Sequence, residues 1–150
     1  DDDDRNSILD MTSEWYQSGT EAVFACGRQV EQPVIEAAEL NDKKIIAAET
    51  DKSQMSDTVM TSAVKDISGV LEELLKQYKS DEFPGGSAEY YNAENNGIWL
   101  DMENSRFSSF SKSQYDSIFD KIKDGSIVVK KYNSGDISSL GLSNVSVSEI

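Results

Sequence analysis

The feature of this sequence that most constrains its fold is an apolar run that is followed by a glycine and then by a segment typical of a helix. Residues 22–26 are typical of a buried strand, Gly27 of a turn, and residues 33–40 of an amphipathic helix. A second apolar run, residues 44–48, predicts another buried strand. Two strands joined by one short helix pair in parallel, so the sequence predicts an α/β protein.

The strand, turn and helix also predict where a ligand would bind. Ligands of open α/β sheets bind beyond the carboxyl ends of the strands, where a helix N-terminus points its free N–H groups. A site in this chain is therefore predicted to begin within residues 24–32. Cys26 lies at the end of the first strand, and we expect it to be a small buried side chain, as free cysteines often are.

Helix and strand signals alternate along the rest of the chain. Helices are predicted at residues 7–17, 64–78 and 111–123, and short strands at 58–61, 88–91, 97–100, 127–129 and 145–147. The helix at 64–78 carries a continuous apolar stripe, and Thr61 and Ser62 are predicted to cap it. A turn at Asn95-Asn96-Gly97 predicts an antiparallel hairpin. The last helix is expected to bury Tyr115, Ile118, Phe119 and Ile122.

The composition of the chain limits the kinds of function that it can have. The chain has 150 residues and is 37% hydrophobic, which fits a single domain spanning residues 1–150. Its net charge of −14 repels phosphate backbones and anionic lipid, so we expect neither nucleic acid nor a membrane surface as a partner. Histidine is absent, which excludes histidine-based catalytic triads and metal sites. No nucleotide-binding glycine motif occurs. We predict a protein without catalytic residues, metal or cofactor.

A family resemblance extends from about Asp3 to Lys130. It rests on the order of these segments: Phe24-Ala-Cys-Gly, Val34-Ile-Glu-Ala-Ala, Lys44-Ile-Ile-Ala-Ala-Glu-Thr-Asp, Val59-Met-Thr-Ser-Ala-Val-Lys-Asp, then Gly85-Gly86, Asn96-Gly-Ile-Trp-Leu and Ile122 to Val129. In this order the chain resembles the second half of the basic membrane protein family, the substrate-binding lipoproteins of ABC importers that include purine-nucleoside receptors. The resemblance implies one lobe of a type I periplasmic-binding fold, a three-layer sandwich with a mostly parallel sheet.

The same resemblance implies four ligand-binding residues. Phe24 matches an aromatic that stacks on the base, and Gly27 lies in a turn where ligand and backbone approach closely. Glu49 stands where the nucleoside receptors have an aspartate that holds ribose hydroxyls, and Lys65 matches a lysine that reaches the ligand or pins that carboxylate. The alternatives are a core phenylalanine, an ordinary turn glycine, an exposed acid and a solvated lysine at a helix start. Asp51 is expected to form a turn or to cap a helix.

The sequence also departs from the family pattern. Residues 28–33 replace a run that is richer in glycine, and Glu49 is one methylene longer than aspartate. Both departures affect which solute would bind.

The resemblance implies a ligand-binding lobe of an extracytoplasmic, lipid-anchored protein that delivers a nucleoside-like solute to an ABC permease. Family members are about twice this length, so the first lobe, which supplies the other wall of the cleft, is missing from this chain. The elements that open the second lobe would precede Asp1, and an uncovered sheet edge could then pair with a second copy as a homodimer. The alternative function is a non-transport sensor or interaction module of the same fold that acts by self-association.

Overall fold

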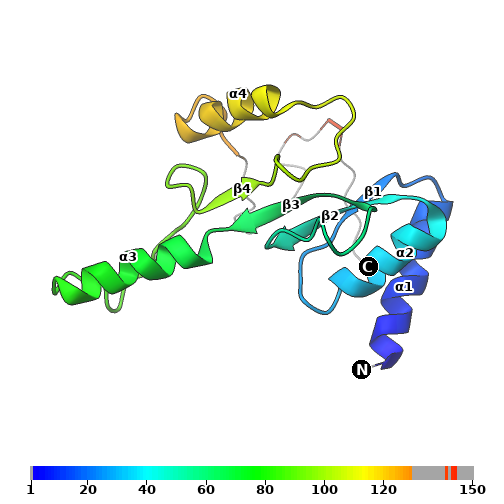
Figure 1. Ribbon diagram of the computed structural model, residues 1–150, viewed down its shortest axis with the longest axis horizontal. Helices are drawn as coiled ribbons and strands as arrows, with labels where there is room; N and C mark the ends of the chain where they lie inside the picture. The colour runs from blue at the N-terminus through cyan, green and yellow to red at the C-terminus, as the bar shows by residue number, and fades with distance from the viewer. Residues whose placement is uncertain (1, 130–140, 142, 145–150) are drawn as a thin grey trace.

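The fold is built on one four-stranded sheet, seen in a computed structural model that describes residues 2–129, 141 and 143–144. The strands are β1 (Ala22–Phe24), β2 (Lys44–Glu49), β3 (Val59–Lys65) and β4 (Ile98–Leu100), in the order β1-β2-β3-β4 (Figure 1). The first three run parallel and β4 runs antiparallel to β3. Helix α2 (Glu31–Asn41) joins β1 to β2. The predicted α/β class and mostly parallel sheet are confirmed.

The core lies between β2, β3 and α2. Ile45, Ala47 and Val59 from the strands are buried against Val34 and Ile35 of α2, as the apolar runs predict. These contacts fix α2 on one face of the sheet.

Helix α1 (Asp2–Gln17) packs on α2. The helices approach closely because Ala37 and Ala38, both fully buried, present only methyl groups to the contact. Tyr16 is also buried, and its hydroxyl donates to the backbone carbonyl of Lys44 over 2.9 Å. This bond ties the end of α1 to the start of β2.

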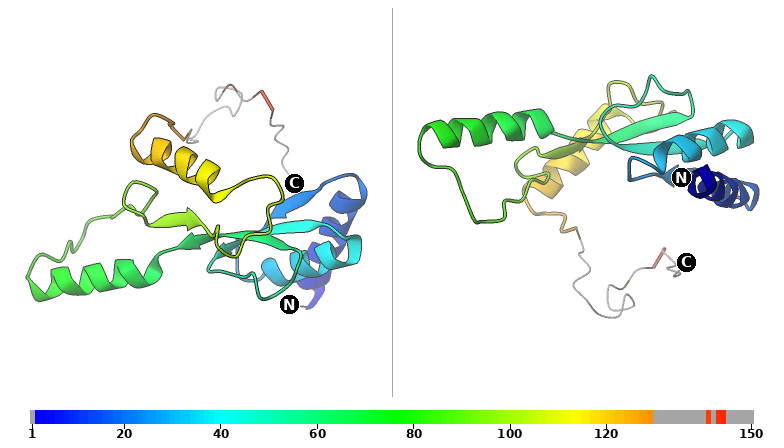
Figure 2. Two further views of the ribbon diagram at one scale, coloured as in Figure 1. Left: turned by 45° about the horizontal axis from the view of Figure 1, so that its top comes forward. Right: turned by 90° about the horizontal axis from the view of Figure 1, so that it is seen from below.

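Helix α3 (Ile67–Lys79) projects from the sheet as an arm (Figures 1 and 2). The side chain of Asp66 caps it by accepting from the Gly69 N–H at 2.9 Å, so Thr61 and Ser62 are not its caps. They lie inside β3 and are buried. No residue of α3 is buried, although its apolar stripe predicted packing.

Helix α4 (Lys112–Lys123) begins with a capping box made by Ser111 and Gln114. It lies above β4 (Figure 1). None of its residues is fully buried, and Ile118 is 43% exposed, so the prediction that its four apolar residues form core was wrong. The short strand β4 offers too little surface to cover the helix.

The segment after β4 continues alongside β3 as a strap, residues 101–106. The Asp101 N–H donates to the Ser62 carbonyl and the Arg106 N–H to the Met60 carbonyl. The Arg106 guanidinium donates to the carbonyls of Val59 and Ser53, each at 3.0 Å, and contacts Asp57. The strap thus fixes the loop between β2 and β3.

Three further predictions of local structure were wrong. The third strand runs on to Lys65, because Asp66 caps the helix and the helix begins at Ile67, three residues later than the apolar pattern suggested. Residues 88–91 form no strand, so there is no hairpin, and β4 pairs with β3 instead. Residues 127–129 are not a strand, and the strand predicted at 145–147 lies outside the described residues. Among the described helices, none is both long and apolar enough to cross a membrane.

Candidate functional site

The three parallel strands end along one edge of the sheet, and each contributes a residue that the sequence singled out. Phe24 is the last residue of β1, Glu49 of β2 and Lys65 of β3. The register places Glu49 opposite Val64, beside Lys65. This edge corresponds to the place where open α/β sheets bind ligands.

Glu49 and Lys65 form an ion pair across this edge. The Lys65 Nζ lies 3.6 Å from the Glu49 Oε1, and both side chains are about half exposed. Lys65 is the last residue of β3, whereas the sequence predicted that it lies at the start of a helix. Glu49 adopts a left-handed backbone with φ 71°, which L-residues seldom do. Such strain is frequent at functional sites.

Phe24 and Gly27 differ in how they fit their predicted roles. The Phe24 side chain is 57% exposed, so its ring is not part of the core. Gly27 has φ 139°, and its carbonyl accepts from the N–H groups of Val30 and Glu31 at the start of α2. It is therefore a turn glycine whose conformation other residues rarely adopt. Cys26 is exposed and not buried, because the strand ends at Phe24 and Cys26 belongs to the loop.

Glu31 lies within the range 24–32 where the sequence predicted that a site begins, but the sequence did not predict what its side chain contacts. Its side chain is buried, and its Oε1 accepts from the Ala48 N–H at 3.0 Å. The Lys52 Nζ lies 3.4 Å from its other oxygen. Glu31 thus holds the backbone immediately before Glu49. In the sequence, Glu31 is recognisable only as an acidic residue in the first turn of a helix. Its partner is a backbone group of β2, which no side-chain pattern reveals.

Asp51 forms the turn that follows β2, as one of its two predicted roles required. Its carboxylate accepts from the Ser53 N–H at 2.8 Å and from the Asn104 amide at 3.2 Å. The Ser53 N–H is the main cause that lowers the pKa of Asp51. Ser62 accepts from the Lys52 N–H at 3.0 Å and joins the same loop to β3. These bonds position Lys52 beside Glu31.

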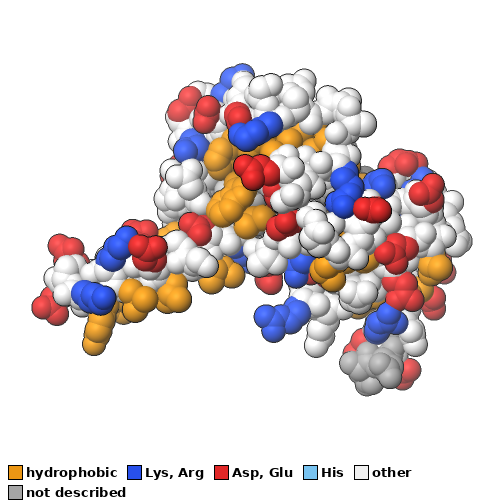
Figure 3. All heavy atoms as spheres, in the orientation of Figure 1, with side chains coloured by type: hydrophobic (Ala, Val, Ile, Leu, Met, Phe, Trp, Pro, Cys, Tyr) orange, Lys and Arg blue, Asp and Glu red, His pale blue; other side chains and the backbone are white. Residues whose placement is uncertain are grey.

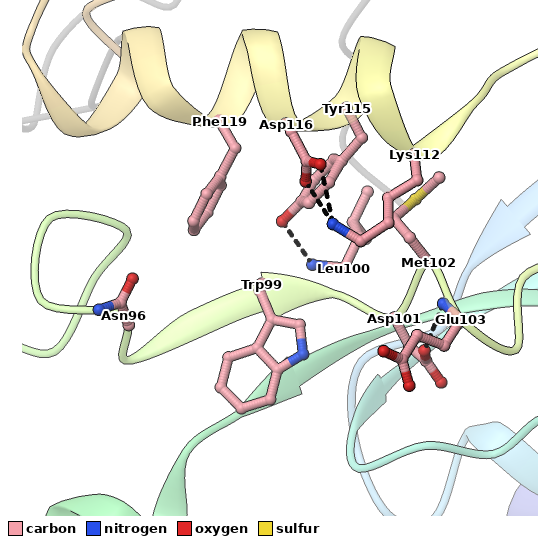
Figure 4. A pocket seen from close by; sticks show the side chains of 10 residues that line it. All are labelled: Asn96, Trp99, Leu100, Asp101, Met102, Glu103, Lys112, Tyr115, Asp116 and Phe119. Atoms are coloured by element: carbon pink, nitrogen blue, oxygen red, sulfur yellow. Dashed lines mark hydrogen bonds and ion pairs between the residues drawn. The ribbon is translucent and has the colours of Figure 1, made fainter.

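A hollow of about 410 Å³ lies between β4 and α4 (Figure 4). Two pairs of its polar groups bond to each other: the Leu100 N–H donates to the Tyr115 hydroxyl at 3.0 Å, and Lys112 contacts Asp116 at 2.8 Å. The Tyr115 and Phe119 rings stack at 5.3 Å. Figure 4 shows the Trp99 indole directed away from α4. The bond between Leu100 and Tyr115 attaches α4 to β4, and Asn96, Asp101 and Glu103 add further polar groups to the lining.

The described residues contain no group of three or more cysteine or carboxylate side chains placed to hold a metal ion. The groups offered at the carboxyl ends of the strands are the Glu49 carboxylate with the Lys65 ammonium, and the exposed Phe24 ring at the end of β1, opposite Ile46 of β2.

Known proteins resemble this chain in sequence. A protein-family model described as ABC transporter substrate-binding protein PnrA-like matches residues 2–133. An ABC transporter nucleoside-binding protein, BmpA of Lactococcus lactis subsp. cremoris, is 28% identical over an alignment that covers 59% of this chain and 30% of that protein.

Solved structures share the fold. A transcriptional activator of the comK gene from Bacillus halodurans matches with a TM-score of 0.64 and 18% identity, over 81% of this chain and 41% of that one. Solute-binding proteins of ABC transporter systems match from Conexibacter woesei (TM-score 0.63, 15% identity, 85% and 43% covered) and Aeropyrum pernix (0.64, 12%, 89% and 46%). The chain spans less than half the length of each of these relatives.

Proposed function

The chain belongs to the family of PnrA-like ABC transporter substrate-binding proteins, and from this premise we propose that it forms one wall of a cleft that binds a nucleoside-like solute. The family consists of substrate-binding proteins and not of enzymes, in agreement with a sequence that lacks histidine. The resemblance noted in the sequence is thereby confirmed at the level of the family.

The observation that supports the proposal is the Glu49–Lys65 ion pair at the carboxyl ends of β2 and β3, with the exposed Phe24 ring at the carboxyl end of the neighbouring strand β1, opposite Ile46. An exposed aromatic face at the end of β1 offers a surface on which a heteroaromatic ring can stack. The Glu49 carboxylate accepts hydrogen bonds from hydroxyl groups, and the Lys65 ammonium donates to a heteroatom or holds the carboxylate in place. A ring joined to a hydroxylated sugar matches this combination.

The proposed site is open and needs an opposing wall. Phe24 is 57% exposed, and both members of the ion pair are half exposed. Small-ligand sites usually bury most of the ligand. We assign the opposing wall to a first lobe of the same protein, and cleft closure to a movement of the two lobes. In this proposal the whole protein is extracytoplasmic and lipid-anchored, and it delivers the solute to an ABC permease.

The test is calorimetric titration of purine and pyrimidine nucleosides into the whole protein, with the 150-residue chain alongside. We expect saturable binding to the whole protein, weaker binding to the chain alone, and loss of binding in Phe24→Ala and Glu49→Ala. The matched control is Glu21→Ala, since Glu21 is also an exposed acid paired with a lysine, Lys43, but at the start of β1. This control should bind like the unchanged protein.

If none of the nucleosides binds to the whole protein, the proposal that the solute is nucleoside-like is wrong. Binding that survives both Phe24→Ala and Glu49→Ala would move the site away from this edge.

A separate part of the proposal is that two copies associate through β1, the outermost strand on one side of the sheet. Within the described sheet β1 is an edge strand, so its outer backbone groups are available to pair with a second copy. The strand has only three residues, which limits the number of hydrogen bonds such a pairing can form. A non-transport module of the same fold remains the alternative function, but family membership favours solute binding.

A further inference from the structure

The backbone at Glu49 is bent into a tight turn at the carboxyl end of β2. The Thr50 N–H donates to the Ala48 carbonyl over 2.9 Å, and Glu49 between them has φ 71°. A bond between residues two positions apart, with a positive φ at the central residue, is the mark of a γ-turn that is rare and strained. Backbone strain of this kind persists only where the surrounding structure imposes it.

The end of β1 leaves Ala48 without a neighbouring strand on one side. β2 lies between β1 and β3 (Figure 1), and the Ile46 carbonyl accepts from the Ala25 N–H at 3.0 Å. Alternate residues of a strand direct their backbone groups to the same neighbour, so the groups of Ala48 also face the β1 side. β1 ends at Phe24, opposite Ile46, before it could pair with Ala48. Because Ala48 is buried, its N–H and carbonyl need partners from elsewhere.

Thr50 and Glu31 are these partners. The Ala48 carbonyl accepts from the Thr50 N–H, which closes the turn, and the Ala48 N–H donates to the Glu31 Oε1 over 3.0 Å. The Glu31 carboxylate thus takes the place that the next carbonyl of β1 would fill. A buried N–H that loses its acceptor is costly, so this bond ties the residue before Glu49 to α2.

The Glu31 side chain is itself held in place. It is buried, and the Lys52 Nζ lies 3.4 Å from its Oε2. Lys52 is in turn fixed to β3, because its N–H donates to the Ser62 hydroxyl at 3.0 Å. Helix α2, which carries Glu31, packs on the sheet through Val34 and Ile35. Both oxygens of the carboxylate therefore have a defined partner.

The charges near the carboxyl end of β2 are balanced in pairs. Glu31 pairs with Lys52, and Glu49 pairs with Lys65 at 3.6 Å. Figure 3 shows acidic and basic side chains mixed in the same way over the face that it draws. Glu31 is buried, whereas Glu49 is about half exposed. Of the two carboxylates, Glu49 is thus the one that a solute can reach.

We propose that Glu31 is a positioning residue of the candidate site: its carboxylate holds the strained turn that carries Glu49, and so keeps the Glu49 carboxylate where it can accept from the hydroxyl groups of a solute. The effect on a solute rests on the proposed function, whereas the hold on the turn does not. Glu31 itself does not touch the solute in this proposal.

The expected effect on binding follows from the population of the turn. The apparent affinity of a protein falls in proportion to the fraction of molecules that are in the binding-competent conformation. If the turn at Glu49 forms only about one tenth of the time without its bond to Glu31, binding weakens about 10-fold.

Two substitutions separate the reach of the Glu31 side chain from its charge. Glu31→Gln keeps the length and an oxygen for the Ala48 N–H, whereas Glu31→Asp keeps the charge but is one methylene too short for the 3.0 Å bond. Both should fold, because glutamine is nearly the same size and aspartate suits the first turn of a helix. Ile35→Val is the matched control, since it trims a buried side chain of the same helix and leaves the bond to Ala48 in place.

The first measurement needs no solute. Nuclear magnetic resonance of the 150-residue chain gives the scalar and residual dipolar couplings that report φ at Glu49. We expect a positive φ in the unchanged chain, in Glu31→Gln and in Ile35→Val. In Glu31→Asp the couplings should show that the positive φ is lost or averaged with other values.

The second measurement is calorimetric titration of adenosine, and of uridine, into the whole protein. Glu31→Asp should weaken nucleoside binding by about 10-fold or more, while Glu31→Gln and Ile35→Val should stay within about 3-fold of the unchanged protein. A role in general stability alone would not be rescued by Glu31→Gln and spared by Ile35→Val in this way.

A positive φ at Glu49 that persists in Glu31→Asp would overturn the proposal. An affinity loss that Ile35→Val shares would also overturn it, because the loss would then reflect the stability of the fold. If neither nucleoside binds the unchanged whole protein, the proposed function is contradicted, and the couplings still decide whether Glu31 holds Glu49.

Discussion

Tyr16 shows how one buried side chain couples this fold to pH. Burial raises the pKa of the Tyr16 hydroxyl to about 12, with a smaller opposing effect from its hydrogen bond with the Val23 backbone. A raised pKa in the folded state means that the stabilisation is complete below the ordinary value of 10.0 and is lost as the pH rises toward 12. The loss reaches about 2 kcal/mol at the upper end of this range.

We predict that Tyr16→Phe removes this part of the alkaline destabilisation. At neutral pH the variant should lose about 1 kcal/mol, because the bond to the Lys44 carbonyl is gone while the ring still packs. Urea unfolding at neutral pH and at alkaline pH measures both effects. If the two proteins lose stability equally above pH 10, the titration of Tyr16 is not the cause.

Glu31 offers a second prediction at the residue scale. Glu31→Gln keeps an oxygen for the Ala48 N–H and should cost about 1 kcal/mol, whereas Glu31→Ala leaves that buried N–H unpaired and should cost about 2–3 kcal/mol. Urea unfolding ranks the two variants. Glu39→Ala is a control on the same helix at an exposed position. Equal losses in Glu31→Gln and Glu31→Ala would show that the backbone bond is not what matters.

The sequence predicted some site residues and missed others for a definite reason. Phe24, Glu49 and Lys65 follow strand-like runs, and parallel strands end on the same side of a sheet, so their place at the strand ends and the pairing of Glu49 with Lys65 were predictable. The partner of Glu31 is a backbone group 17 positions away, and no side-chain pattern records it. Cys26 was misplaced because the strand stops two residues earlier than its apolar run.

At the scale of elements, one side chain of the strap at residues 101–106 joins it to the loop between β2 and β3. Arg106 forks between the Val59 and Ser53 carbonyls and also contacts Asp57, so a single planar group fixes two segments to each other. Lysine carries one compact ammonium and does not reproduce this fork.

We therefore predict that Arg106→Lys destabilises the fold by about 1–3 kcal/mol. Hydrogen exchange should rise in the loop between β2 and β3, where Ser53 and Asp57 lie. Arg28→Lys serves as the control, because Arg28 is exposed on the loop before α2. Unchanged exchange in that loop would mean that the strap does not depend on the guanidinium.

Helices and strands were predictable where the spacing of their apolar residues matches the pattern in which those residues are buried. Helix α2 and strands β1 and β2 lie within two residues of their predicted ranges, and α1 ends where predicted but begins five residues earlier, at Asp2. The boundary between β3 and α3 was not predictable from hydrophobicity, since Val64 fits either pattern and the Asp66 cap decides. The apolar stripe of α3 predicted a helix that packs against another surface. The stripe alone does not identify that surface.

At the scale of the whole molecule, charge is strongly unbalanced. Asp and Glu number 28 against 14 Lys and Arg, so the folded state holds a net charge of −14 in a small volume. Salt screens this repulsion, but it also weakens the exposed ion pairs, such as those between Lys76 and Glu72 and between Lys112 and Asp116. Pairs of this kind contribute only about 0–1 kcal/mol each.

Because the repulsion involves every excess acid while each pair is weak, screening of the repulsion should win. We predict that the midpoint of thermal unfolding rises as sodium chloride is increased from about 0.02 M to about 0.3 M. Choline chloride at equal ionic strength should act like sodium chloride if screening is the cause. A midpoint that responds to sodium alone would instead indicate a specifically bound cation, and a falling midpoint would show that the ion pairs outweigh the net charge.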